Sequence, residues 1–352
     1  MGKSKLALGL DIGSSSVKLV QLKQKKDGYA LLGFGSAPLP PEAIVDGALM
    51  NSSAIVEAIQ TLLSEQRVKA KDVAIGVRGH SVIIKKIQMP RMSQEELDDS
   101  IQWEAEQYIP FDVKDVNIDT QILTPEGDAA GQMDVLLVAA KKDMIADYTA
   151  VCAEAGLAVS VVDVDAFAVQ NAFENNYDLP PGDTVVLVNV GAAVSNINVI
   201  ANGTTTFTRD VTMGGNAFTE EIQKQLNVSY EEAEALKVGG HGESDAVVPQ
   251  EVERVIQGVA EQMAGEIQRS LDFYASTAAE HRIAHLYLSG GTARLPALIK
   301  AIEQRAGVPV EVLNPFRGID VDHKRFDPAL IANASAAAAV AVGLALRRAG
   351  DK

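Results

Sequence analysis

A strand–turn–strand pattern that occurs twice constrains this 352-residue chain more than any other feature. In the first copy an apolar segment ends in Asp11, turns through Gly13 and three serines, and becomes apolar again. In the second copy Gly191 lies 178 positions after Gly13, and the same offset aligns Asn189 with Asp11. A pattern repeated at about half the chain length predicts two related lobes that face each other.

The two turns have the composition of phosphate-binding turns. Glycine and small residues let backbone amides converge on an anion. Asp11 would repel a phosphate directly, so its expected role is to hold a hydrated Mg²⁺ that binds the phosphate oxygens. An ordinary hairpin with a polar turn is the alternative for either copy alone.

Charge and length limit the classes of function. The formal net charge is −16, and no dense cluster of Lys and Arg occurs, which argues against a nucleic-acid partner. Cys152 is the only cysteine, so no internal disulfide forms and a reducing compartment fits. The apolar segment 336–346 is shorter than a membrane-spanning helix, and we expect a buried helix there and no direct membrane insertion.

The order of predicted strands and helices indicates an α/β protein with an insertion. We expect residues 1–80 and 143–180 to form the first lobe, together with a C-terminal helix over 333–350. Residues 81–142 read as an inserted subdomain with its own strands and helix. Residues 181–332 form the second lobe, and they include a smaller helical part at about 211–265.

Aromatic residues in the insertion raise the question of a partner site. The predicted helix starts with a capping box at Ser93, and its apolar stripe includes Tyr108. Trp103 and Phe111 lie off or beyond that stripe. They either pack elsewhere or contribute to a surface for a partner.

Two further patterns in the second lobe suit contacts with a sugar and with a flat ligand. Glu234 and Lys237 share one helix face, where they form either a surface pair or a contact with sugar hydroxyls. Gly290 and Gly291 follow a predicted strand and let the backbone approach a flat ligand closely, although a plain turn is the alternative.

Together these motifs resemble the actin-like ATPase superfamily, which includes actin, heat-shock chaperone ATPases, sugar kinases and FtsA. The segment Trp103–Phe111, the opening turn and the 214–237 segment are most similar to the PilM family of type IV pilus assembly proteins. This resemblance implies an actin-like fold of two lobes, each with a mixed twisted sheet and flanking helices, and an FtsA-type inserted subdomain. It assigns ATP and Mg²⁺ to the following residues: Asp11, Gly13, Ser14, Ser15, Ser16, Lys18, Asn189, Gly191, Ala192, Ala193, Gly214, Gly215, Glu234, Lys237, Gly290, Gly291 and Thr292.

The resemblance also implies an adaptor role. Such a protein holds the cytoplasmic N-terminal peptide of PilN in a groove beside the inserted subdomain, for which Trp103, Tyr108 and Phe111 are candidates. It acts indirectly with PilO and PilP, and pilus motor ATPases are further candidate partners. The expected location is the cytoplasmic face of the inner membrane, reached through the partner.

Asn189 departs from the family pattern, because members that hydrolyse ATP usually carry Asp in the second turn. We therefore expect slow hydrolysis or none, with Asp165 as the sole candidate for orienting water. Two other functions stay open from the sequence. One is an enzyme of this fold, either a sugar or acetate-type kinase or an active ATPase. The other is an FtsA-like filament-forming protein.

Overall fold

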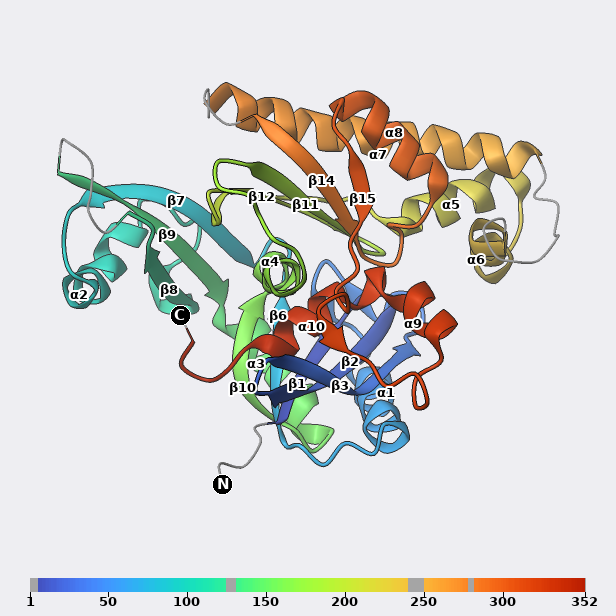
Figure 1. Cartoon of the computed structure of the whole chain (residues 1–352), viewed down its shortest axis with the longest axis horizontal. Helices are drawn as coiled ribbons and strands as arrows, with labels where there is room; N and C mark the ends of the chain where they lie inside the picture. Colours follow the sequence, from blue (N-terminus) through green and yellow to red (C-terminus); the bar gives the residue numbers. More distant parts are fainter. Residues whose placement is uncertain (1–5, 125–130, 240–249, 278–281, 352) are drawn as a thin grey trace.

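A computed structural model describes residues 6–124, 131–239, 250–277 and 282–351. Figure 1 shows two lobes stacked one above the other and a third, smaller unit that projects to one side. The projecting unit is the insertion: the chain leaves the lower lobe to form it and returns to the lower lobe before it builds the upper lobe.

The first lobe is built on a six-stranded sheet with the order β10-β6-β1-β2-β3-β16. Successive residues of β2 point to opposite faces, so Leu19 packs with one core cluster and Val20 with another. α1 and α3 cover the first face, and α4 and α10 (Ala339–Leu346) cover the second. The elements are β1 (Leu6–Ile12), β2 (Ser16–Lys25), β3 (Gly28–Pro38), β4 (Ile44–Val45), β5 (Ala48–Leu49), α1 (Ser52–Glu65), β6 (Asp72–Val77), α3 (Lys142–Glu154), β10 (Ala158–Val164), α4 (Asp165–Asn176) and β16 (Ile319–Asp320).

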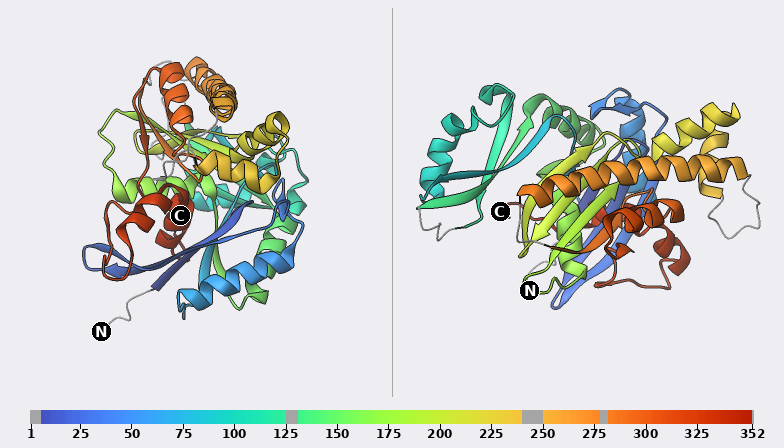
Figure 2. Two further views of the ribbon diagram at one scale, coloured as in Figure 1. Left: turned by 90° about the vertical axis from the view of Figure 1, so that its right-hand side faces the viewer. Right: turned by 90° about the horizontal axis from the view of Figure 1, so that it is seen from above.

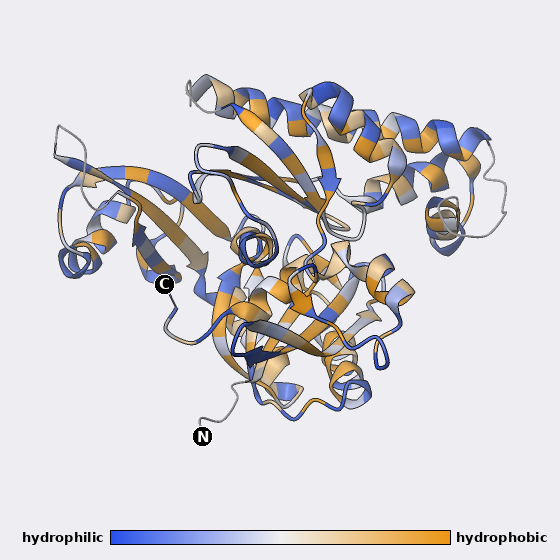
Figure 3. Ribbon diagram, viewed as in Figure 1, coloured by the Kyte–Doolittle hydropathy of each residue, from blue (hydrophilic) through white to orange (hydrophobic). Residues whose placement is uncertain are grey.

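The second lobe is built on a five-stranded sheet with the order β13-β12-β11-β14-β15. The 28-residue helix α7 lies along this lobe, as Figure 2 shows, and its buried side chains share one cluster with α5, α8 and the sheet. Figure 3 shows α7 alternating between hydrophobic and hydrophilic residues, the pattern of a helix with one buried face. The elements are β11 (Thr184–Val190), β12 (Ser195–Ala201), β13 (Thr204–Val211), α5 (Gly215–Leu226), α6 (Tyr230–Gly239), α7 (Gln250–Thr277), β14 (Ile283–Ser289), α8 (Pro296–Ala306) and β15 (Val310–Val312).

Helices α4 and α10 join the lobes. Their side chains form one core cluster with residues of β6 below and of β11 and β12 above. The two helices cross so closely that a Cβ atom added to Gly343 of α10 would lie 1.6 Å from the carbonyl oxygen of Ala168 in α4. Only glycine fits at this crossing, and the base of the cleft between the lobes is therefore tightly packed.

The inserted subdomain has a sheet and a core of its own. Its strand order is β7-β9-β8, and α2 packs on one face through Leu97, Ile101 and Ala105. The predicted capping box at Ser93 is present. The elements are β7 (Val82–Pro90), α2 (Gln94–Ala105), η1 (Val113–Asp115), β8 (Val116–Ile122) and β9 (Gln132–Lys141).

The expected C-terminal helix over 333–350 is wrong as one continuous element. The chain instead forms α9 (Pro328–Ala334), a 3-10 turn η2 (Ala336–Ala338) and α10 (Ala339–Leu346). The break occurs where the Ala336 carbonyl accepts a hydrogen bond from the Gly290 amide at 2.7 Å. Within the described ranges no single helix has the length and apolar composition to cross a membrane. Helix α9 and the 336–346 segment meet both criteria only when they are counted together, and the chain bends by 62° between them.

Candidate functional site

The two repeated turns have the same geometry. Strands β1 and β2 pair so that Asp11 is opposite Lys18, and β11 and β12 pair so that Asn189 is opposite Asn196. The Gly13 amide donates to the Ser16 carbonyl at 3.1 Å, and the Gly191 amide donates to the equivalent Val194 carbonyl at the same distance. The internal repeat in the sequence is thus a repeat of backbone structure.

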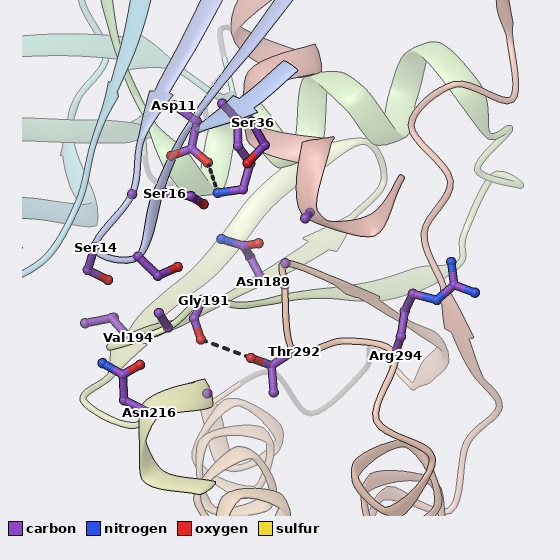
Figure 4. A pocket seen from close by; sticks show the side chains of 18 of the residues that line it. Asp11, Ser14, Ser16, Ser36, Asn189, Gly191, Val194, Asn216, Thr292 and Arg294 are labelled. Carbon is purple, nitrogen blue, oxygen red and sulfur yellow. Dashed lines mark hydrogen bonds and ion pairs between the residues drawn. The ribbon is translucent and has the colours of Figure 1, made fainter. Parts of the chain in front are cut away.

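Both turns open into one cavity of about 570 Å³ between the lobes. Figure 4 shows Asp11 and Ser16 on one side of this space and Asn189 and Thr292 on the other. A volume of this size suits a small-molecule ligand. The cavity is lined by these residues of the expected nucleotide set: Asp11, Gly13, Ser14, Ser15, Ser16, Lys18, Asn189, Gly191, Ala192, Gly215, Glu234, Lys237, Gly290, Gly291 and Thr292.

Two members of the expected set lie outside the cavity lining. Gly214 caps the start of α5, and the next residue's amide donates to the Gly191 carbonyl at 2.8 Å, so this segment supports the second turn from behind. Ala193 lines a separate small cavity together with Asp210, and this cavity shares Ser14, Arg78 and Val194 with the main one.

Asp11 is buried and contacts two cations. Lys18 Nζ lies 3.2 Å from Asp11 Oδ2, and Arg78 Nη1 lies 3.5 Å from Oδ1. Within the described residues, no three His, Cys, Asp or Glu side chains gather as a metal site would require. A single carboxylate still fits Mg²⁺, which keeps several waters and is held largely by phosphate oxygens.

Arg78 is a cavity residue that the sequence reasoning missed. It follows the end of β6, donates to the Ile12 carbonyl at 3.0 Å and forms an ion pair with Asp165. Burial alone would lower the pKa of this guanidinium, but the carboxylates of Asp165 and Asp11 raise it above its ordinary value. The available signal was a lone arginine directly after a buried strand that runs beside β1.

The structure does not bring Asp165 to the cavity. The residue starts α4, is 1 % exposed and has Arg78 as its partner, while its second carboxylate oxygen has no hydrogen bond. Burial raises the pKa of Asp165 to about 6, against the opposing effect of Arg78. Its expected part in orienting water has no support from this position.

The far end of the cavity combines polar and apolar groups. Lys237 Nζ lies 2.6 Å from Glu234 Oε2 and donates to the Thr219 hydroxyl, so the charge of this buried lysine is used within the second lobe. Gly290 has a φ of +95°, and a Cβ there would lie 2.3 Å from the Val190 carbonyl oxygen, so the turn requires glycine. The sequence reasoning did not assign the following lining residues, which come from separate segments: Ser36, Val194, Asn196, Asn216, Tyr230, Val238, Arg294, Leu295, Asn333 and Ala337.

A second cavity of about 400 Å³ lies between the inserted subdomain and the first lobe, and residues 203–205 of the second lobe also line it. Two strands at sheet edges border it, β8 of the insertion and β10 of the first lobe, and α4 forms part of its wall. Asp163 is buried here, 3.4 Å from Arg347 Nε and 3.4 Å from Asn171 Nδ2. Burial raises the pKa of Asp163, and Arg347 opposes that shift.

The three aromatic candidates for partner binding do not line this second cavity. Tyr108 and Phe111 pack against the core of the inserted subdomain, and Lys141 lies over the Phe111 ring at 4.6 Å. Trp103 is 79 % exposed on α2. The structure thus separates Trp103 from the other two residues.

Comparisons with known proteins agree with this architecture. A solved structure described as the PilM-PilN type IV pilus biogenesis complex is 30% identical, covers 97% of this chain and 98% of that chain, and has a TM-score of 0.86. MreB 5 of Spiroplasma citri bound to AMPPNP shares the fold at 10% identity, with coverage of 97% and 95% and a TM-score of 0.50. The cell division protein FtsA of Streptococcus pneumoniae is 24% identical, over 90% of this chain and 77% of FtsA.

These likenesses confirm the actin-like ATPase fold and the resemblance recognised in the sequence. A family model described as type IV pilus assembly protein PilM matches residues 9–349. Because this match spans both lobes, both repeated turns and the insertion, the chain belongs to the PilM family of type IV pilus assembly proteins.

Proposed function

We propose that the protein is a nucleotide-dependent adaptor of the type IV pilus machine. It binds ATP with Mg²⁺ between its lobes and holds the cytoplasmic N-terminal peptide of PilN beside the inserted subdomain. Through PilN it is attached to the inner face of the inner membrane and acts with PilO and PilP, within reach of the motor ATPases. The similarity to a PilM-PilN complex supports PilN as the partner.

The observation that carries the nucleotide proposal is the convergence of both turns and the Gly290 turn on one cavity. At the phosphate end, Lys18 and Arg78 flank the carboxylate of Asp11, and Arg78 also pairs with the buried Asp165, so the charges of the two cations are balanced until a ligand binds. A triphosphate is held there by backbone amides and these two cations, and Mg²⁺ neutralises further charge when bound.

The carboxylates in the cavity argue for binding without rapid chemistry. Among the described lining residues only Asp11 and Glu234 carry one, and each is paired with a cation. A kinase needs a general base within hydrogen-bond reach of the acceptor hydroxyl. With Asn189 in the second turn, we expect turnover far below that of a working kinase or ATPase.

The second cavity is the better candidate for the peptide groove. Edge strands β8 and β10 leave backbone groups at its border, and an extended peptide can hydrogen-bond to such an edge while its side chains enter the cavity. The lining carboxylates of Asp119, Asp163 and Glu174 outnumber the cation Arg347. A peptide with basic side chains complements this excess of negative charge.

Calorimetry with Mg-ATP tests the nucleotide proposal. Asp11→Ala should abolish binding and leave the circular dichroism spectrum unchanged, because it removes the carboxylate that holds the hydrated metal. Asp27→Ala is the matched control, since this exposed residue lies in the turn between β2 and β3, at the end of β2 far from Asp11. Undiminished affinity in Asp11→Ala contradicts the role of this residue. Turnover above about once per second with a small acceptor points to a kinase, and polymer pelleted with Mg-ATP points to a filament.

Two lysine substitutions locate the peptide. Leu123→Lys adds a cation to the second cavity, and Trp103→Lys adds one to the exposed side of α2. We expect fluorescence anisotropy of a labelled PilN N-terminal peptide to show weaker binding to Leu123→Lys only. The reverse result places the peptide on α2, and neither variant should alter affinity for Mg-ATP.

A further inference from the structure

Four polar side chains form a ladder across the second-lobe sheet. Ser289, Asn189, Asn196 and Asp210 are register partners on the neighbouring strands β14, β11, β12 and β13. The Ser289 hydroxyl donates to Asn189 Oδ1 at 3.2 Å, Asn189 Nδ2 donates to Asn196 Oδ1 at 3.4 Å, and Asn196 Nδ2 donates to Asp210 Oδ1 at 2.6 Å. Each side chain therefore contacts the next on the same face of the sheet.

The ladder ends on the other lobe. The backbone amide of Gly79, which follows β6 of the first lobe, donates to Asp210 Oδ2 at 3.0 Å. The preceding residue, Arg78, contacts the first turn through the Ile12 carbonyl. Asp210 thus joins the second-lobe sheet to the segment that supports the first phosphate turn.

Hydrogen-bond direction fixes the chemistry of the ladder. The Asp210 carboxylate accepts only, so Asn196 must present its NH₂ group to Asp210 and its carbonyl oxygen to residue 189. Residue 189 must therefore donate. Asparagine can donate, whereas the carboxylate of an ionised aspartate would face the carbonyl oxygen of Asn196, and both groups only accept. If the Asn196 amide were flipped, its carbonyl oxygen would instead face the Asp210 carboxylate.

We propose that Asp210 is an interlobe latch at the phosphate end of the cleft, and that Asn189 is a positioning residue for it, acting as the donor that orients Asn196. The first lobe uses the equivalent register positions differently, since Asp11 and Lys18 form an ion pair that faces the cavity. The hydrogen-bond ladder therefore gives a structural explanation for asparagine at position 189, independent of catalysis. The consequence for ligand affinity rests on the nucleotide function proposed above, but the latch itself exists without a ligand.

Hydrogen exchange in the nucleotide-free full chain tests the latch directly. We expect Asp210→Ala to accelerate exchange of the peptide 76–82, which contains the Gly79 amide, by about 2- to 10-fold, the effect of losing one ordinary hydrogen bond. Asn189→Asp should accelerate exchange in the same peptide, because it disrupts the ladder two side chains away. Arg209→Ala is the control: this exposed neighbour on β13 points to the opposite face.

The combination of variants separates the possible outcomes. Unchanged exchange in Asp210→Ala overturns the latch, and acceleration in Asp210→Ala but not in Asn189→Asp overturns the role of Asn189. Asp210→Asn keeps the shape of the side chain and should accelerate exchange less than Asp210→Ala does. The melting temperature of Asp210→Asn shows whether this variant is still folded. Calorimetry should then show several-fold weaker Mg-ATP binding in Asp210→Ala. Failure of the unmodified protein to bind Mg-ATP refutes the proposed function alone, since exchange is measured without nucleotide.

Discussion

Replacing Arg78 with alanine tests the charge arrangement at the phosphate end of the cleft. The guanidinium is the partner of Asp165, whose side chain is 1 % exposed, and it also contacts Asp11. Removing one member of a buried ion pair costs about 3–5 kcal/mol, because the other charge stays buried without a partner. Arg78 is itself partly exposed, so we expect the lower end, a loss of about 3 kcal/mol in the free energy of unfolding at pH 8.

The loss should depend on pH. Burial raises the pKa of Asp165 to about 6, above the value of about 3.9 in an unfolded chain. Because the folded state binds this proton more tightly, the contribution of Asp165 to stability is fully present below about pH 4 and is lost as the pH rises through 6. Without Arg78 the pKa of Asp165 in the folded state rises further, because Arg78 no longer stabilises the ionised carboxylate, so Asp165 is neutral in the variant at pH 5.5. The difference from wild type should then shrink to about 1 kcal/mol, the effect of the lost hydrogen bonds.

Urea unfolding followed by circular dichroism at pH 8 and pH 5.5 measures both values. The double variant Arg78→Ala/Asp165→Asn should be more stable at pH 8 than Arg78→Ala, because it removes the unpartnered charge. Arg209→Ala, which removes an exposed arginine on β13, should change stability by less than about 0.5 kcal/mol. Equal losses for Arg78→Ala at the two pH values, or no recovery in the double variant, refute the ion-pair reasoning.

Two further predictions concern packing. Gly343→Ala should destabilise the protein by about 3 kcal/mol or more, because its new Cβ meets the Ala168 backbone in the helix crossing. Gly258 lies on the exposed side of α7 with open space around it, so Gly258→Ala should instead stabilise the protein by about 0.5–1 kcal/mol. Urea unfolding measures both free-energy changes, and two changes of the same sign contradict this account. Burial raises the pKa of Cys152 to about 12, so at pH 8 only about one thiol in 10,000 is ionised. A disulfide reagent should therefore modify Cys152 only when the chain unfolds, and rapid labelling of the native protein would show that the thiol is accessible.

The sequence predicted those parts of the site that lie within single motifs. Both repeated turns and the Gly290 turn, which line one cavity, could be found because each needs glycine and small residues within a few positions. Arg78 was missed because its contacts with Asp11 and Asp165 form only in the folded sheet. There β6 pairs with β1 on one side and with β10 on the other, and α4 starts directly after β10. Tyr230 and Val238 were missed for the same reason, because nothing local marks a residue as facing a cavity built from distant segments.

The partner site shows a different limit of sequence reasoning. Aromatic residues near the inserted helix suggested a binding surface, but an apolar residue is equally consistent with the core, and Tyr108 and Phe111 pack there. The second cavity combines β8, β10, α4 and Arg347, which lie more than 200 residues apart at the extremes. Only the completed fold brings two sheet edges together at one place.

The asymmetry between the lobes bears on how a chain of net charge −16 would hold the triphosphate proposed above. In the first lobe Lys18 and Arg78 line the cavity and pair with Asp11 and the buried Asp165. The second lobe contributes the amides of Asn189 and Asn196 and the cation Arg294, whereas the charge of Lys237 is paired with Glu234. Both lobes therefore bring cations to the cavity, and the second lobe also supplies shape and hydrogen bonds. Because the two contributions come from different lobes, a ligand receives both only when the lobes are close together, and this is the geometry that the Asp210 contact with Gly79 maintains.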